Sequence, residues 1–251
     1  MKRTRTTRLA VAAVASALVL AGCGSNGDDP SDEPSDAPSS ASGTQLYFVD
    51  GNTADYSKDF DPGTLEGVRA TYPGAELGDA FRERLLEVDP KLRDFTYGPE
   101  SYDAAILIAL SAVAAGNDSG KAIGSKMQEV SAEGEKCTEL KACADLLAAG
   151  TDIDYDGVSG PIEFNSTGSP SSATIGIFEY AADNTYAPER FETGEIPDVD
   201  EVGEDQKITG DIPQGDGTLT IGTLLPQSGD LAFLGPPEIA GVKLAIEEIN
   251  A

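Results

Sequence analysis

Hydrophobic and polar positions change their spacing several times along the chain, and each change predicts an element. Apolar β-formers run together in QLYFV, residues 45–49, and Asp50 and Gly51 follow, which is typical of a strand that ends in a turn. In GDAFRERLLEV, residues 78–88, apolar residues recur at helical spacing, and Pro90 ends the predicted helix. The patterned part of the chain therefore starts with a strand and a helix.

The most apolar segment outside the N-terminus, SYDAAILIALSAVAAG, predicts a deeply buried helix. We expect it to begin at Ser101 as the N-cap, to carry Asp103 in its first turn and to end at Gly116. Ala, Ile and Leu occupy most of its circumference, so little of this helix can face water. Two further helices are expected at residues 121–130 and 138–149.

The next patterned stretches indicate a β-hairpin. GPIEF, residues 160–164, and ATIGIFEYA, residues 173–181, have the composition of two strands, and the turn-rich NSTGSPSS joins them. Because strands and helices are mixed along this part of the chain, residues 45–187 are predicted to form an α/β fold.

Composition divides the rest of the chain into two segments. Residues 188–217 are acidic and rich in Pro and Gly, which predicts a linker. After it, residues 218–225 predict a strand, and a loop leads into a helix from about Pro237 to Asn250. Residues 218–251 thus have the form of an opening βα unit.

Composition and charge exclude several classes of function. The chain has 44 acidic against 17 basic residues and a formal net charge of -27, so we expect no nucleic-acid partner. It contains no His, which removes the Ser/His/Asp triad and every His-containing metal site. We therefore expect a protein that is not an enzyme and that needs no cofactor and no metal.

The N-terminus predicts export and lipid anchoring. Four basic residues precede an apolar run from Leu9 to Leu20, as in a secretory signal peptide, here residues 1–22. The run ends in LAGC, which matches the lipobox of bacterial lipoproteins and predicts that Cys23 is lipidated. Residues 23–44 would follow as a polar, disordered tether. This places the protein on the outer face of the cell membrane, held there by its lipid.

Two blocks of sequence resemble one known family. IGTLLPQSGDLAFLGPPEIAGVKLAIEEINA, residues 221–251, resembles the start of the mature domain of type I periplasmic binding proteins of the branched-chain amino acid (Leu/Ile/Val) family, the lipoprotein receptors of ABC importers. Residues 45–186 resemble the C-terminal part of that family through GTLEGVRATYPGAE, SYDAAILIALS and YDGVSGPIEFNSTGSPSSATIGIFEY. The two blocks stand in permuted order, and the middle of the family's domain is missing from this sequence, so the resemblance implies a partial type I fold.

The resemblance also implies a function and a binding site. The ligand would be a branched-chain or related amino acid, delivered to an ABC transporter permease. In the family, an acidic residue binds the α-ammonium group, an aromatic residue forms one wall of the site, a loop lies beneath the ligand and apolar residues form another wall. The resemblance assigns these four roles, in the same order, to Asp50, to Tyr97, to Ser228 with Gly229, and to Phe233 with Leu234. The family's hydroxyl groups for the ligand carboxylate lie in the missing middle, so we expect weak affinity or none.

Each of these assignments has a plainer alternative. Asp50 can be a turn residue before Gly51, and Tyr97 can be an ordinary core or surface tyrosine. For the whole chain, the alternative to a solute receptor is a degenerate or rearranged surface lipoprotein that binds no ligand.

Two local patterns concern Cys and acidic residues. With Cys23 lipidated, Cys137 and Cys143 remain, and an exported compartment favours a disulfide between them. In DIDYDGVSGPIEF, residues 152–164, acidic residues and a Gly have the spacing of an EF-hand calcium loop. However, the segment after Glu163 favours a turn where an EF-hand needs a helix. We therefore predict a structural loop that leads into a strand, with calcium as the alternative.

Overall fold

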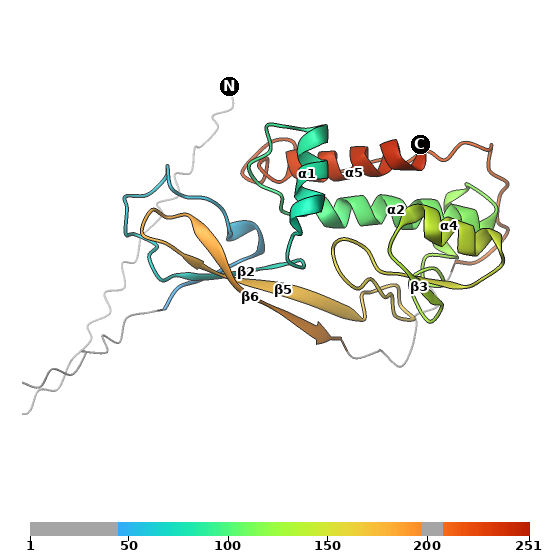
Figure 1. The fold of residues 1–251 in the computed structure, drawn as a ribbon, viewed down its shortest axis with the longest axis horizontal. Coiled ribbons are helices and arrows are strands. Elements are labelled where there is room, and N and C mark those ends of the chain that lie inside the picture. The colour runs from blue at the N-terminus through green and yellow to red at the C-terminus, as the bar shows by residue number, and fades with distance from the viewer. Residues whose placement is uncertain (1–44, 197–207) are drawn as a thin grey trace, which may run out of the picture. The chain divides into compact units, whose positions relative to one another are not determined.

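The computed structural model describes residues 45–196 and 208–251 as a mixed α/β structure (Figure 1). The predicted signal peptide, Cys23 and the tether lie outside the described residues, as does the stretch 197–207 of the predicted linker. In the part of the chain that is described, no helix is long and apolar enough to cross a membrane.

Strands form two sheets. The larger sheet has four strands in the order β1-β2-β5-β6, which are β1 (Tyr47–Val49), β2 (Arg69–Pro73), β5 (Ser172–Tyr180) and β6 (Tyr186–Glu195). β1 pairs with β2 in parallel, whereas β2, β5 and β6 are antiparallel neighbours. The smaller sheet pairs β3 (Glu135–Cys137) with β4 (Ile153–Tyr155) in parallel.

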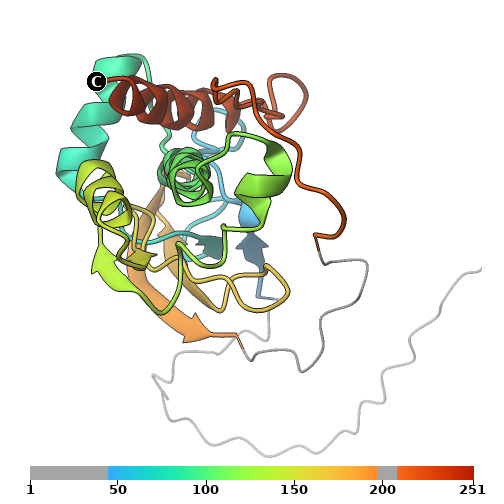
Figure 2. The same cartoon turned by 90° about the vertical axis from the view of Figure 1, so that its right-hand side faces the viewer.

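The helices are η1 (Asp50–Asn52), α1 (Asp79–Val88), α2 (Gly98–Ala115), α3 (Gly120–Gly124), α4 (Leu140–Ala148) and α5 (Gly235–Ile249). The longest of them, α2, is central and largely buried. Figure 2 looks along α2, which lies among α1, α4 and α5. The main core forms where these helices meet and includes Leu85, Ile106, Leu110 and Ala245, none more than 1% exposed. A second, smaller core under the four-stranded sheet contains Leu65, Phe178 and Tyr180.

The last helix packs closely on the central one. A Cβ atom on Gly241 of α5 would lie 2.1 Å from the carbonyl oxygen of Gly98, so only glycine permits this approach. Near the other end of α5, Glu248 accepts hydrogen bonds from Tyr102 of α2, at 2.6 Å, and from Arg84 of α1. A segment from the end of the sequence thus completes a core built by residues 81–155.

Several predicted elements are confirmed. The strand at 45–49 is β1, and the helices expected at 78–88, 138–149 and 237–250 are α1, α4 and α5. The predicted C-terminus of α2 is also correct, because Gly116 adopts a left-handed conformation and caps the helix.

The predicted start of α2 is wrong by four residues, because the predicted N-cap is Ser101. The helix begins at Gly98, its N-cap is Tyr97, and Pro99 occupies its first turn, where the missing amide costs no hydrogen bond. Ser101 therefore lies inside the helix, and Asp103 lies in the second turn. The helix predicted at 121–130 is also too long, since α3 ends at Gly124 and turns follow it.

Two corrections concern strands around the predicted hairpin. GPIEF forms no strand, because Pro161 has no amide to donate to a ladder; Gly160 and Phe164 make only isolated bridges, with Gly157 and Pro170. The partner of β5 is instead β6, which continues through Glu195. The segment predicted as a linker, 188–217, therefore begins too early.

The strand predicted at 218–225 is absent. These residues have no regular structure, and the side chain of Leu224 is fully exposed. The chain leading into them is held by one side chain from α3 and one from the loop after α2. Lys121 donates to the carbonyl oxygens of Thr209 and Asp211, at 2.7 and 3.3 Å, and Asp118 accepts from the amide of Thr218 at 2.9 Å. A segment with a strand pattern forms a strand only where another strand lies beside it. The contacts described here are with single side chains, so they provide no neighbouring strand.

Candidate ligand-binding site

The contact between Asp50 and Tyr97 joins two of the predicted ligand-binding residues. Asp50 begins η1 directly after β1, and Tyr97 is the N-cap of α2. The Tyr97 hydroxyl donates a hydrogen bond to Oδ1 of Asp50 across 47 residues of sequence. Both residues have positive φ, 50° and 60°, a backbone conformation that is uncommon outside glycine and often found at functional sites.

The electrostatics of this contact keep the tyrosine protonated. Burial raises the pKa of the Tyr97 hydroxyl, and the hydrogen bond to Asp50 raises it further. The hydroxyl therefore remains a donor at neutral pH. A carboxylate has two oxygens, so Asp50 can accept a second donor while Tyr97 holds the first.

The loop before α5 reaches the same region. Cδ2 of Leu231 is 3.0 Å from the position of a Cβ on Gly51, and the carbonyl oxygen of Pro237 is 3.2 Å from the position of a Cβ on Gly98. The loop therefore lies against η1, and the first turn of α5 lies against the start of α2. These contacts are made by Leu231 and Pro237, which lie close in sequence to the C-terminal predicted site residues.

The predicted residues in this loop differ in exposure. Ser228 and Gly229 are exposed, and Phe233 is half-buried. Leu234 is only 6% exposed and precedes α5 as its N-cap, so its side chain offers little surface to a ligand.

The start of α5 is poorly equipped to hold a carboxylate. Pro236 and Pro237 have no amide hydrogen, which removes two of the donors that a helix N-terminus normally presents. Glu238 adds a carboxyl group to the same first turn. An amino acid placed here would therefore have to find partners for its carboxylate elsewhere.

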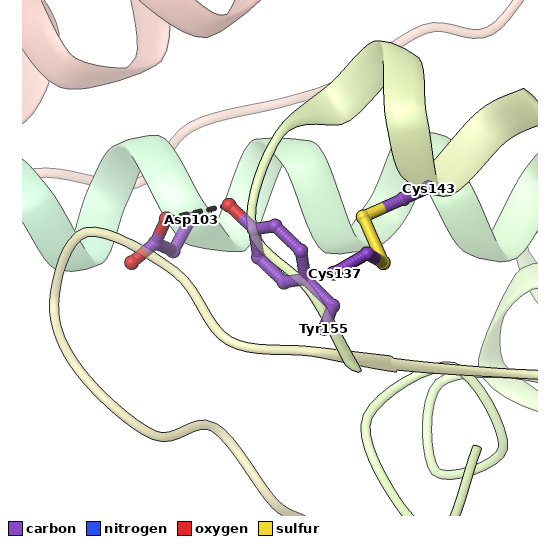
Figure 3. Close-up of a disulfide and its surroundings, with 4 residues drawn as sticks. All are labelled: Asp103, Cys137, Cys143 and Tyr155. Atoms are coloured by element: carbon purple, nitrogen blue, oxygen red, sulfur yellow. Dashed lines mark hydrogen bonds between the residues drawn. A yellow bond between two sulfur atoms is a disulfide. The ribbon is translucent and has the colours of Figure 1, made fainter. Parts of the chain in front are cut away.

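Asp103 organises a buried network that the sequence analysis did not predict. It accepts hydrogen bonds from the Tyr155 hydroxyl (2.8 Å), the Val158 amide (3.1 Å) and both the amide and hydroxyl of Ser159 (2.7 and 2.6 Å), as Figure 3 shows in part. A Cβ on Gly157 would lie 2.2 Å from the Asp103 carboxyl group. Burial raises the pKa of Asp103, and the hydrogen bonds from Ser159 oppose this. The network fastens the YDGVSG segment to α2, which is a structural role.

The stretch with EF-hand spacing adopts a different structure. Ile153–Tyr155 is strand β4, so the acidic residues do not line a loop. Nζ of Lys136 lies 2.9 Å from Asp154 and 3.0 Å from Asp156, and it supplies the positive charge between them. Within residues 45–196 and 208–251, no three acidic or Cys side chains are arranged to hold a metal ion.

The predicted disulfide is confirmed. Cys137 at the end of β3 is bonded to Cys143 in α4, with their Cα atoms 5.5 Å apart (Figure 3). Both side chains are buried, 6% and 0% exposed, so the bond lies inside the main core. It holds the start of α4 against the smaller sheet.

Behind Tyr97 lies a cavity that the sequence analysis missed. It has a volume of about 540 Å³ and is lined by Tyr97 and Glu100 of the α2 start and by Tyr72, Phe178 and Tyr186 of the sheet. No local signal marks these residues, because β2, which carries Tyr72, has no clear strand pattern. The one available sequence signal concerned the cavity wall at the start of α2. Pro99 and Glu100 are typical of the first turn of a helix, so they indicated that α2 begins before Ser101.

Comparison of the chain with known protein families, with curated proteins and with solved structures finds no match.

Proposed function

We propose that the chain is an extracytoplasmic solute-binding lipoprotein of an ABC importer, with part of a type I periplasmic binding protein fold. Its ligand would be a branched-chain or related amino acid. The observation that supports this most is the hydrogen bond between Tyr97 and Asp50, with the loop before α5 lying against Gly51. Two residues that the resemblance assigns to one ligand are therefore in contact across the chain, and Leu231, from the loop that carries the other assigned residues, lies beside them.

In the proposed complex, Asp50 binds the ammonium group of the ligand. Its side chain is exposed, so a ligand can approach it, and Tyr97 fixes its orientation through Oδ1. The ring of Tyr97 and the half-buried Phe233 would contact the apolar side chain of the ligand. Such a site combines one oriented charge with apolar walls, as small-molecule sites commonly do.

We expect the affinity to be weak. The start of α5 has few amide donors because of Pro236 and Pro237, so the ligand carboxylate keeps most of its hydration. Each charge-assisted hydrogen bond that is not made forgoes about 1.5 to 3 kcal/mol of binding free energy. A dissociation constant on the order of 1 mM, about -4 kcal/mol, is consistent with one such bond and an apolar contact.

The test is an NMR titration of the ¹⁵N-labelled chain with leucine, isoleucine and valine. Saturable shifts of the Gly51 and Gly98 amides are expected, because these glycines flank the Asp50–Tyr97 contact. Asp50→Asn should abolish the shifts, since an amide offers no charge to the ammonium group. Asp59→Asn is the matched control, because Asp59 is also exposed, lies in the same connection between β1 and β2 and undergoes the same charge change. No saturable shift with any of the three amino acids, or equal binding by the Asp50 variant, would reject the proposal.

A further inference from the structure

The cavity behind Tyr97 has one wall made of stacked aromatic rings. Tyr72 of β2 stacks on Phe178 of β5, with 4.5 Å between ring centroids and 19° between planes. Tyr186 of β6 meets Phe178 edge to face at 5.5 Å. Three neighbouring strands thus present a continuous aromatic surface to a space of about 540 Å³, a volume typical of small-molecule sites.

Glu100, at the start of α2, lines the same cavity and has an unsatisfied carboxyl oxygen. Its Oε2 atom is buried and has no hydrogen-bond partner in the described part of the chain. Its Oε1 atom lies only 2.8 Å from the position of a Cβ on Gly74, so the carboxyl group is held against the chain that leaves β2. Buried polar atoms in folded proteins nearly always have a partner, and an exception calls for a ligand, an ion or water.

The charges around the cavity favour a cation. The lining contains five acidic side chains and two basic ones, which are Asp55, Glu76, Asp79, Asp94 and Glu100 against Arg82 and Arg93. The guanidinium group of Arg82 lies over the ring of Phe95, 4.4 Å from its centroid, so part of its charge is already engaged. The faces of aromatic rings attract cations as well.

We propose that this cavity binds a small organic monocation with a flat apolar body, of the arylalkylammonium class. The ammonium group donates to Oε2 of Glu100, and the ring lies against the half-buried Tyr72 and Tyr186, which pack on the buried Phe178. This site shares Tyr97 with the one proposed for an amino acid but is otherwise distinct from it. It uses a different carboxyl group and requires no partner for a ligand carboxylate.

The titration of Glu100 is consistent with this role. Burial raises its pKa to about 7, and the nearby Asp103 raises it as well. At neutral pH the group is therefore poised between its acid and its carboxylate, and a bound cation would stabilise the carboxylate.

The test uses three probes of similar size and different charge, which are phenethylamine, phenethyl alcohol and phenylacetate. Binding to the folded chain is followed by NMR at pH 8, where Glu100 is ionised. Phenethylamine should bind at least about tenfold more tightly than phenethyl alcohol, because a charge-assisted hydrogen bond contributes that much or more. Phenylacetate should be the weakest of the three. Equal binding of amine and alcohol, or tighter binding of phenylacetate, would overturn the proposal.

Two variants assign the effect to this cavity. Glu100→Gln should remove the preference for the amine over the alcohol, whereas Glu83→Gln, an exposed site on α1 with the same charge change, should leave it unaltered. If Glu100→Gln does not fold, Tyr72→Leu replaces it and should weaken amine binding about two- to fivefold through the lost ring face. A wild-type preference in both variants contradicts the assignment. The leucine titration is independent of these outcomes, so the two proposals can fail separately.

Discussion

Glu100 shows how a single buried carboxyl group links the structure to pH. Its ordinary pKa is 4.5, and burial raises this value to about 7 in the folded protein. A raised carboxyl pKa means that the folded state prefers the protonated form. The contribution of this protonation preference to the free energy of unfolding is therefore complete below about pH 4.5 and is lost as the pH rises through about 7.

We predict that Glu100→Gln stabilises the protein at pH 8 and leaves its stability nearly unchanged at pH 4. Gln resembles the neutral acid, so the variant does not have to bury a charge. The shift from 4.5 to about 7 corresponds to about 3 kcal/mol between the two pH values. Urea unfolding of wild type and variant at both pH values measures this difference, and Glu83→Gln is the control. Parallel pH profiles of wild type and Glu100→Gln would contradict it.

The surroundings of Glu100 and Asp103 could not be predicted from sequence patterns. Asp103 has the position of an ordinary first-turn acid in the predicted helix, yet the true helix start places it one turn further in. There it meets Tyr155 and Ser159, more than 50 residues away in sequence. Burial of a polar side chain depends on what packs over it from distant segments, and local periodicity does not contain that information. The resemblance assigned Asp50 and Tyr97 to one ligand site but did not predict the hydrogen bond between them, and their role in binding stays a prediction.

At the scale of elements, α5 depends on its close approach to α2. Gly241 lets the helices meet at the carbonyl of Gly98, while Ala240, Leu244 and Ala245 are buried in the main core. The helix thus contributes both shape and apolar surface to that core.

We predict that Gly241→Ala destabilises the protein although alanine is the better helix former. The new methyl group would collide with the Gly98 carbonyl oxygen, and overpacking of this kind costs about 1 to 3 kcal/mol. Lys243→Ala on the exposed side of α5 serves as the control. Urea unfolding compares the two, and a Gly241→Ala variant as stable as wild type would show that α5 does not pack as described.

Helices were more predictable than strands for a physical reason. A helix satisfies its backbone locally, so α1, α4 and α5 follow from spacing and capping residues. A strand needs a partner, and β6 illustrates the difficulty, since its charged residues Glu189, Arg190 and Glu192 have the composition of a linker. Charges of this kind are common on edge strands, where they discourage association with other sheets. Conversely, residues 218–225 have a strand pattern but no neighbouring strand.

At the scale of the whole molecule, the proposed function requires attachment to a membrane. No helix among the described residues can cross a bilayer. In the proposed function, the predicted lipid on Cys23, which lies outside the described residues, would provide the anchor. Stable anchoring by acyl chains needs more than one chain, and diacylation at a lipobox cysteine would meet that need.

We predict that Cys23→Ala releases the protein from the membrane. After expression in an exporting bacterium, the wild-type chain should partition into the detergent phase of a Triton X-114 extract, and the variant into the aqueous phase. The double variant Cys137→Ser/Cys143→Ser is the control for loss of Cys and should partition like wild type. Detergent-phase partition of Cys23→Ala would contradict lipid anchoring at this residue.

The docking of α5 has a consequence for the kinetics of folding. Glu248 meets Arg84 across 164 residues of sequence, so the main core closes only when two remote segments find each other. Closing so long a loop costs entropy before any contact offsets it, and folds with such distant contacts form slowly. A slowly closing core keeps the chain in a partly folded state for longer after synthesis. If the predicted signal peptide directs the chain to a translocon that passes unfolded chains, this delay would leave it time to be exported before the core forms.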